Sequence, residues 1–298
     1  MKYTELHLHL DGSMRAQTLN DLAKDAGITL PKDIRFFSGM GLQEALLKFD
    51  STVACLQRID HLRRVAAEIC EDAINYSVTN LEIRFAPQLH PIAPAEEVVD
   101  AVLDGIDGRA GLILCGLYGD SPTTLLSHVN IAKTRIGVVG IDLAGAPHLS
   151  HKWGIEDYAD AYNKARQLGI GRTVHAGEGN RSPLEIRKAI ELLHAQRIGH
   201  GTSLLEDFSV VELVIDRNVV IEACPTSNMQ TGAIPTVSHH PLPKWLELGI
   251  QVCINSDNWL LSNIDPAEEY QRALSIPGMS TNLLDTCLET GINAVFTR

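Results

Sequence analysis

Eight short apolar runs recur along the chain, and each is separated from the next by a segment with helical periodicity. The runs cover residues 5–10, 80–86, 112–118, 138–144, 173–176, 197–200, 219–223 and 251–255. Between them, apolar residues recur at helical spacing, as in Leu62, Val65, Ala66 and Ile69. Strands that alternate with helices pair in parallel through right-handed crossovers, and eight such units close into a barrel. The sequence therefore predicts an α/β fold, a (β/α)8 TIM barrel.

Polar fragments stand where five of these predicted strands end. They contain His7 and His9, Asp142 to Gly145, His175 to Glu178, His200 between two glycines, and Asp257. In a (β/α)8 barrel the catalytic residues lie at the C-terminal ends of the strands, because the loops that follow the strands meet there. We therefore expect these fragments to share one site at that end of the barrel.

The first fragment has the spacing of a metal-binding pair. Residues i and i+2 of a strand project from the same face, so His7 and His9 can direct two imidazoles at one ion. A third imidazole from His175 and a carboxylate from Asp257 would complete a nitrogen and oxygen set that suits zinc and leaves room for a water molecule. The alternative is that these residues are unrelated surface or capping residues.

The composition and net charge of the chain limit the classes of molecule that it is expected to bind. The chain has 298 residues, 45% of them hydrophobic, and a formal net charge of −12. Nucleic acids and anionic membranes are bound by clustered Lys and Arg, so neither partner is expected and the substrate is predicted to be a small molecule. We find no linker, repeat or membrane-spanning stretch and expect one metal-dependent barrel domain over residues 1–298. The sequence does not specify the oligomeric state.

The ends and the cysteines indicate a compartment. The first predicted strand follows the N-terminal Met so closely that no signal-peptide core precedes it. The six cysteines are far apart and several fall in apolar runs, which is typical of reduced, buried thiols. We therefore expect a cytoplasmic protein, with Cys224 a small core residue at the end of the seventh strand.

A long segment follows the first strand. Residues 13–41 carry a short helical pattern and then a Pro-containing stretch, with Phe36 and Phe37 as its apolar face. This segment is longer than an ordinary strand-to-helix connection and comes directly after the His pair. A lid over the pocket and a packed surface excursion are both compatible with the sequence.

Six fragments occur in an order that resembles the adenosine deaminase family of the amidohydrolase superfamily. They are HLHLDG, DLAG, HAGE, RIGHG, CPTSN and NSDN, and they run from His7 to Asn258. The resemblance implies a (β/α)8 barrel with one catalytic zinc per chain. It also implies a zinc-dependent aminohydrolase that replaces the 6-amino group of an adenosine-like purine nucleoside by oxygen and releases ammonia.

The resemblance also implies a role for each site residue. It makes His7, His9, His175 and Asp257 the zinc ligands, Glu178 the group that protonates purine N1, and His200 the residue that orients or deprotonates the water. It places the backbone N–H of Gly145 at purine N3 and the carboxylate of Asp11 near the ribose 5′-hydroxyl. His200 and Asp257 would hold and relay the water proton.

One departure from the family pattern concerns purine N7. Where the best-known members have two aspartates after the eighth strand, this chain has Asp257 and Asn258. An aspartate must be protonated to donate to N7, whereas an amide donates at any pH, so purine recognition is expected to survive. Asp11 could instead cap the chain turn before Ser13, and Asn258 could have a purely structural role rather than contact the substrate. We expect His148, His151, His239 and His240 to be solvated residues without a ligand role.

Three other functions compete. A binuclear hydrolase of the same superfamily would carry a modified lysine at the end of the fourth strand, where this chain has DLAG. A non-catalytic zinc-binding barrel would be expected to lose Glu178 or His200, and both are present. Within the family, the substrate could be adenine, an N6-substituted adenosine or a 5′-modified adenosine.

Overall fold

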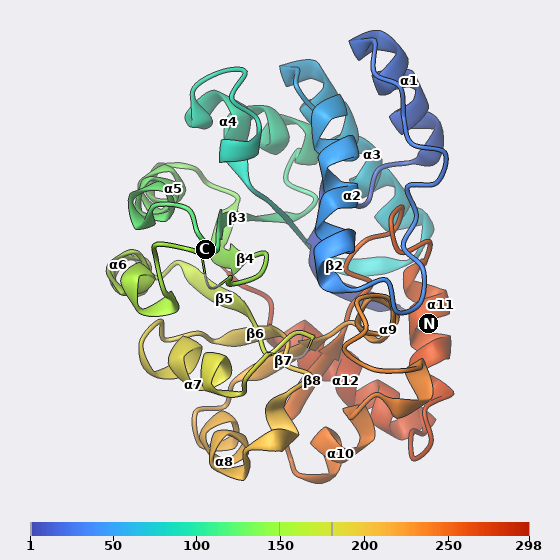
Figure 1. Ribbon diagram of the computed structural model, residues 1–298, viewed down its shortest axis with the longest axis vertical. Helices are drawn as coiled ribbons and strands as arrows, with labels where there is room; N and C mark the ends of the chain where they lie inside the picture. Colours follow the sequence, from blue (N-terminus) through green and yellow to red (C-terminus); the bar gives the residue numbers. More distant parts are fainter. Residues whose placement is uncertain (1, 149, 180, 298) are drawn as a thin grey trace.

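The computed structural model describes residues 2–148, 150–179 and 181–297. Its centre is a sheet of eight parallel strands in sequential order, surrounded by helices (Figure 1). The strands are β1 (Tyr3–His9), β2 (Val78–Phe85), β3 (Gly111–Leu117), β4 (Val138–Ala144), β5 (Gly171–Ala176), β6 (Arg197–His200), β7 (Val220–Ala223) and β8 (Gln251–Ile254). The predicted (β/α)8 barrel is confirmed. The predicted first and last residues of each strand differ from the observed ones by at most two positions.

Amphipathic helices cover the outside of the barrel. They are α1 (Ala16–Ala26), α2 (Leu42–Cys55), α3 (Ile59–Asn75), α4 (Ala95–Ile106), α5 (Pro122–Thr134), α6 (Ala159–Gln167), α7 (Leu184–Glu191), α8 (Phe208–Asp216), α9 (Pro225–Gln230), α10 (Leu242–Glu247), α11 (Pro266–Leu274) and α12 (Thr281–Asn293). The predicted apolar stripe of α3, from Leu62 to Ala73, is buried. None of the helices in the described ranges is long and apolar enough to cross a membrane.

The barrel closes between β1 and the segment that follows β8. A parallel bridge joins Leu8 to Asp257. The N–H of His9 donates to the carbonyl of Asp257 at 2.9 Å, and the N–H of Asp257 donates to the carbonyl of His7 at 3.1 Å. Three predicted metal ligands therefore belong to the backbone hydrogen bonds that close the barrel, so their relative positions are fixed by the main chain.

The inside of the barrel is polar rather than filled with aliphatic side chains. Five charged residues of β2, β4, β6 and β7 are at most 1% exposed there: Glu82, Arg84, Asp142, Arg197 and Glu222. Arg84 contacts Asp142 at 2.8 Å and Glu222 at 2.9 Å. Arg197 pairs with Glu82 and lies 2.7 Å from Glu222. These buried charges are paired, as buried charges must be.

The stretch after α12 closes the end of the barrel where the strands begin. The ring of Phe296 lies beneath the guanidinium of Arg197, at 3.6 Å from the ring centroid, and its N–H donates to Glu82 at 2.7 Å. A Cβ added at Gly171 would lie 2.3 Å from this ring, so only glycine leaves room for it. The ring is 8% exposed and packs with Ile113 and Val139. It therefore forms the floor under the polar interior.

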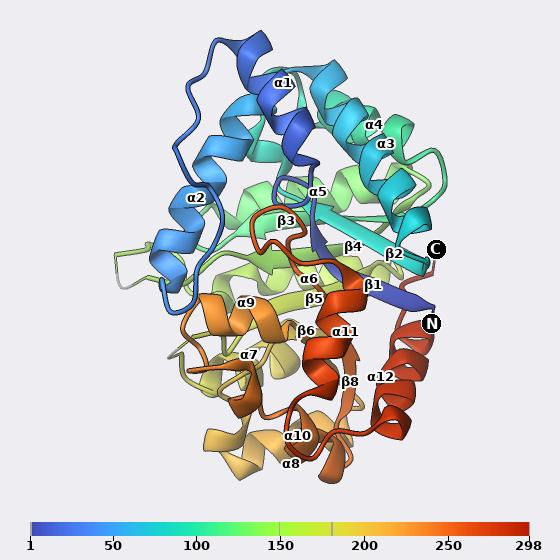
Figure 2. The same cartoon turned by 90° about the vertical axis from the view of Figure 1, so that its right-hand side faces the viewer.

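At the other end of the barrel, α2 and α9 lie beyond the C-terminal ends of the strands (Figure 2). The segment 13–41 consists of α1 and a long loop, and this loop is held by main-chain hydrogen bonds from Phe36 to Leu261 and from Gly39 to Met229. Phe36 is buried, as expected, but Phe37 is half exposed, so the prediction of a shared apolar face is wrong for Phe37. The loop turns only one of the two rings inward.

Phe296→Ala should destabilise the barrel strongly. Removing a buried Phe ring costs roughly 3 kcal/mol or more, and here Arg197 also loses its cation–π contact. The midpoint of urea unfolding should fall, whereas the control Phe208→Ala removes a ring that is 61% exposed and should leave the midpoint nearly unchanged. Equal midpoints for the two variants would contradict the role assigned to Phe296.

Candidate active site

Four predicted ligand atoms converge at the C-terminal ends of β1 and β5 and in the segment after β8. His9 Nε2 lies 3.2 Å from His175 Nε2. Asp257 Oδ1 lies 3.4 Å from the Nε2 atoms of both His7 and His9. Ligands of a tetrahedral zinc at its usual bond lengths are about 3.3 Å apart. These three separations are close to that edge length, and among the described residues the mutually close groups that could hold an ion are His7, His9 and Asp257, and His7, His175 and His200.

Three of these four ligands, His7, His175 and Asp257, are held from the far side by another polar group. Glu222 contacts His7 Nδ1 at 2.6 Å, and Asp142 lies 2.9 Å from His175 Nδ1. Ser227 donates to the second carboxylate oxygen of Asp257 at 2.6 Å. Carboxylates that accept the outer N–H of a metal-binding histidine fix its orientation and leave Nε2 free for the ion. The buried Nε2 of His7 has no hydrogen-bond partner, as expected for a ligand atom.

The ionisation states fit a cation. Burial lowers the pKa of His9 and of His175, so both imidazoles are neutral at pH 7. The adjacent carboxylates of Asp257 and Glu222, in contrast, raise the pKa of His7 against the effect of burial. Burial opposes ionisation of Asp257, but the adjacent imidazoles of His7 and His9 stabilise its carboxylate and hold its pKa well below the usual range. Neutral imidazoles with an ionised carboxylate form the donor set that zinc prefers. The residues therefore fit the expected metal.

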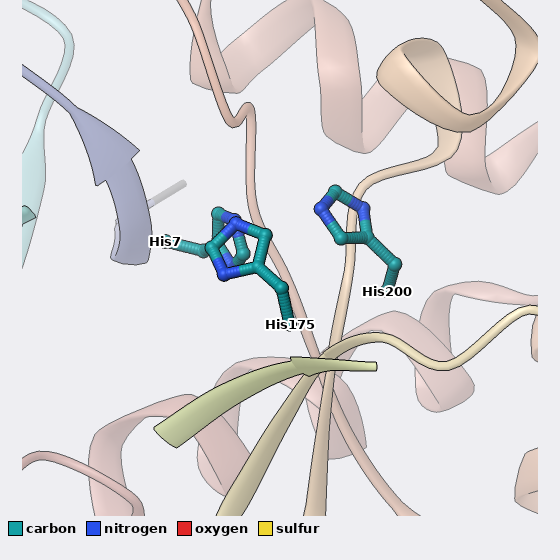
Figure 3. Close-up of side chains that lie close together, drawn as sticks. All are labelled: His7, His175 and His200. Carbon is teal, nitrogen blue, oxygen red and sulfur yellow. The ribbon is translucent and has the colours of Figure 1, made fainter. Parts of the chain in front are cut away.

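Glu178 and His200 lie beside this donor set. Glu178 is buried, and desolvation raises its pKa to about 7, against the opposing charge of Arg181. Its Oε2 lies 3.7 Å from His200 Nε2. The imidazole rings of His7, His175 and His200 gather in one place (Figure 3), with the ring centroids of His7 and His200 4.9 Å apart. His200 is thus also close enough to be considered with the ligands.

Two site residues have a backbone conformation that L-residues rarely adopt. The φ angle is 67° at His200 and 63° at Asp257. Each such conformation costs roughly 1–3 kcal/mol and persists only where the surrounding structure imposes it. Gly199 precedes His200 and lies against the imidazole of His7. A Cβ at this position would lie 2.8 Å from the ring of His7, so glycine is required there. The close packing of the histidines depends on these departures from ordinary strand geometry.

A cavity of about 560 Å³ opens above the donor atoms. Apolar side chains of α2, among them Leu46 and Phe49, form one wall, and the loop after β4 forms another. All the predicted site residues except His7 line this cavity: His9, Asp11, Gly145, His175, Glu178, His200, Asp257 and Asn258. The fold therefore brings the residues from five strand ends to one place.

The predicted substrate-binding residues have unpaired polar atoms. Asp11 Oδ1 and Asn258 Oδ1 are buried without a hydrogen-bond partner among the described residues. Burial raises the pKa of Asp11 to about 6. Gly145 has a φ angle of 79° and lines the cavity with its backbone. Asn258 lies against Gly12, where a Cβ would come within 1.8 Å of its side-chain oxygen. These groups are placed to contact a polar ligand.

The residues that support the ligands are only partly predictable from the sequence. Asp142 stands in a polar fragment that was expected at the site, but without a role, and Glu222 was not predicted there, although a single carboxylate within an apolar strand was a signal for each. The prediction that His240 is solvated is wrong: His240 is 3% exposed and lies 3.1 Å from Asn228, which contacts His200. His148 is exposed, as expected, and Cys224 and the other five cysteines are buried and unpaired.

The comparisons with known proteins agree with this geometry. The family model for adenosine deaminase matches residues 3–298. An adenosine deaminase from Clostridium kluyveri is 33% identical over 98% of this chain and 89% of its own length. The crystal structure of an adenine deaminase from Arthrobacter aurescens has a TM-score of 0.89 at 25% identity, covering 99% of this chain and 94% of that one.

A second solved structure shares the fold. An amidohydrolase from Burkholderia ambifaria, crystallised with bound zinc, has a TM-score of 0.88 at 23% identity and covers 100% of this chain and 86% of its own. The family match over nearly the whole chain and the identity to the Clostridium enzyme together establish the relationship. This chain belongs to the adenosine deaminase family.

Proposed function

We propose that the protein is a zinc-dependent aminohydrolase that converts an adenosine-like purine nucleoside to its 6-oxo product and ammonia. One observation carries the proposal: three of the four metal donors and the buried carboxyl of Glu178, whose pKa is about 7, face the same cavity. His7, His9, His175 and Asp257 would hold one zinc. Bound zinc would lower the pKa of water from roughly 16 to near 7, which supplies a nucleophile at neutral pH.

Glu178 supplies the acid. Addition of water oxygen at C6 breaks the aromaticity of the purine and places electron density on N1, so a proton delivered to N1 lowers the barrier. A carboxyl with an ordinary pKa would be ionised at pH 7, but burial keeps a large fraction of Glu178 protonated. His200 and Asp257 lie where they can orient the water and accept its proton. That proton then passes to the 6-amino group, and the C6–N bond breaks to release ammonia.

The cavity favours a nucleoside over a nucleotide. Its lining includes the carboxylates of Asp11, Asp50, Glu178 and Asp257 and, within the described ranges, no lysine or arginine. A 5′-phosphate would need a cation or several N–H donors to replace its water. The apolar wall from α2 can instead cover a ribose or an apolar 5′ group. We place the Asp11 carboxylate at the ribose, Gly145 N–H at N3 and the Asn258 amide at N7.

We also propose that the segment 13–41 contributes a lid. Phe36 lines the cavity, and its loop is tied to the segment after β8 by the 2.6 Å hydrogen bond to Leu261. The single-domain organisation and the cytoplasmic location stay predictions from the sequence.

The purified protein should hold one zinc per chain. After metal removal and reconstitution, elemental analysis should find one zinc per chain in the wild type and clearly less than one in His9→Ala. His148→Ala, which changes an exposed histidine at the same cavity, should keep one. Two ions per wild-type chain, or full zinc retention by His9→Ala, would overturn the proposed ligand set.

Glu178→Gln should lower kcat by at least about 10²-fold with KM within a few-fold, since the amide fills the space but donates no acid proton. The wild-type kcat/KM should fall as pH rises above about 7, because Glu178 then loses its proton in the free enzyme. The surface variant Glu206→Gln should leave both unchanged. Wild-type turnover by Glu178→Gln would exclude Glu178 from the mechanism.

Adenosine should be a far better substrate than AMP. We expect kcat/KM for AMP to be at least about 10²-fold lower, since its phosphate would be buried beside carboxylates. A panel of adenosine, deoxyadenosine, adenine, N6-methyladenosine, 5′-modified adenosines and AMP, followed by ultraviolet absorbance, tests this. Equal turnover of AMP and adenosine would contradict the assignment, and a preference for adenine would reassign the substrate to the free base.

A further inference from the structure

A buried histidine outside the predicted donor set is connected to the site by hydrogen bonds. His240 precedes α10, is 3% exposed and packs edge-on against Trp245, with ring centroids 5.2 Å apart. Its Nδ1 accepts the backbone N–H of Leu242 at 3.1 Å. A backbone N–H can only donate, so this nitrogen carries no hydrogen. Neutral His240 must therefore carry its hydrogen on Nε2.

This hydrogen fixes the orientation of the next side chain. His240 Nε2 lies 3.1 Å from Asn228 Oδ1 on α9. Because Nε2 donates, Asn228 must present its carbonyl oxygen there. The opposite orientation of the amide would place two donors against each other in a buried site, at a cost of roughly 1–3 kcal/mol. The amide nitrogen of Asn228 therefore points the other way.

The amide nitrogen in turn fixes His200. Asn228 Nδ2 lies 3.0 Å from His200 Nδ1, and an amide N–H₂ can only donate. His200 Nδ1 is thus an acceptor, and neutral His200 carries its hydrogen on Nε2. This is the nitrogen near Glu178 Oε2 and the donor set. The chain of donors from Leu242 to the site runs in one direction only.

We propose that Asn228 and His240 are positioning residues that hold His200 as its Nε2–H tautomer. In the proposed reaction, on which this inference rests for its kinetic part, His200 then donates a hydrogen bond to the attacking oxygen. It does not take the proton of the water, because its Nε2 already has one and its Nδ1 faces the amide N–H of Asn228. The carboxylate of Asp257 accepts that proton.

Asn228→Asp gives the sharpest test. The carboxylate is nearly the same size but can only accept, so it should draw the hydrogen of His200 to Nδ1 and invert the tautomer. Long-range ¹H–¹⁵N spectra of protein labelled in histidine report the hydrogen position, and loss of a signal in His200→Gln assigns His200. The spectra are recorded with and without added zinc.

We expect the Nε2–H tautomer in the wild type and the Nδ1–H tautomer in Asn228→Asp. Turnover of adenosine by Asn228→Asp should fall at least about 10-fold with KM within a few-fold, since the lost interaction acts on the reacting oxygen. A wild-type Nδ1–H tautomer, or the same tautomer in both proteins, overturns the proposal. The spectra decide this even if no purine is turned over, which keeps it separate from the proposed function.

A second pair of variants tests His240 itself. His240→Leu removes the donor that orients Asn228, so the His200 signals should show a mixture of tautomers and kcat should fall by a smaller factor than in Asn228→Asp. His239→Leu changes the neighbouring exposed histidine and should leave spectrum and kcat unchanged. If the His200 signals of His240→Leu are the same as in the wild type, His240 does not determine the tautomer of His200.

Discussion

The polar network inside this barrel depends on the contacts of one buried carboxylate, that of Glu222. It contacts His7 Nδ1 at 2.6 Å, Arg84 at 2.9 Å and Arg197 at 2.7 Å, and it accepts the hydroxyl of Thr173 at 3.0 Å. A buried carboxylate is tolerated only when its partners replace the lost water. Here those partners come from β1, β2, β5 and β6, so one side chain of β7 joins five strands.

This network connects the floor of the barrel to the site. Phe296 and Glu82 hold Arg197 from below, while Glu222 and Arg84 extend the contacts upward to His7 and, through Asp142, to His175. Breaking a buried ion pair by removing one partner typically costs about 3–5 kcal/mol. The orientation of the predicted ligand atoms is thus supported by the same contacts that stabilise the barrel, so fold stability and site geometry are coupled.

The segments at the C-terminal ends of the strands turn individual side chains toward the cavity. Two residues with left-handed backbone, His200 and Asp257, turn their side chains into the cavity. The short helix α9 then places Ser227 against Asp257 and Asn228 against His200. A strained backbone persists only where such contacts impose it. These two residues therefore stand at or just beyond the strand ends, and hydrogen bonds from α9 fix the orientation of their side chains.

The sequence alone determined the eight strands, the barrel and the positions where polar residues leave the strands, because periodicity and strand ends are local properties. It did not predict the partners of Glu222, Asp142 or His240. Glu222 and His7 are 215 positions apart, and nothing local to either residue indicates that they meet. Only closure of the barrel brings them into contact, so the tertiary structure decided which polar residues support the site and which way His200 presents its hydrogen.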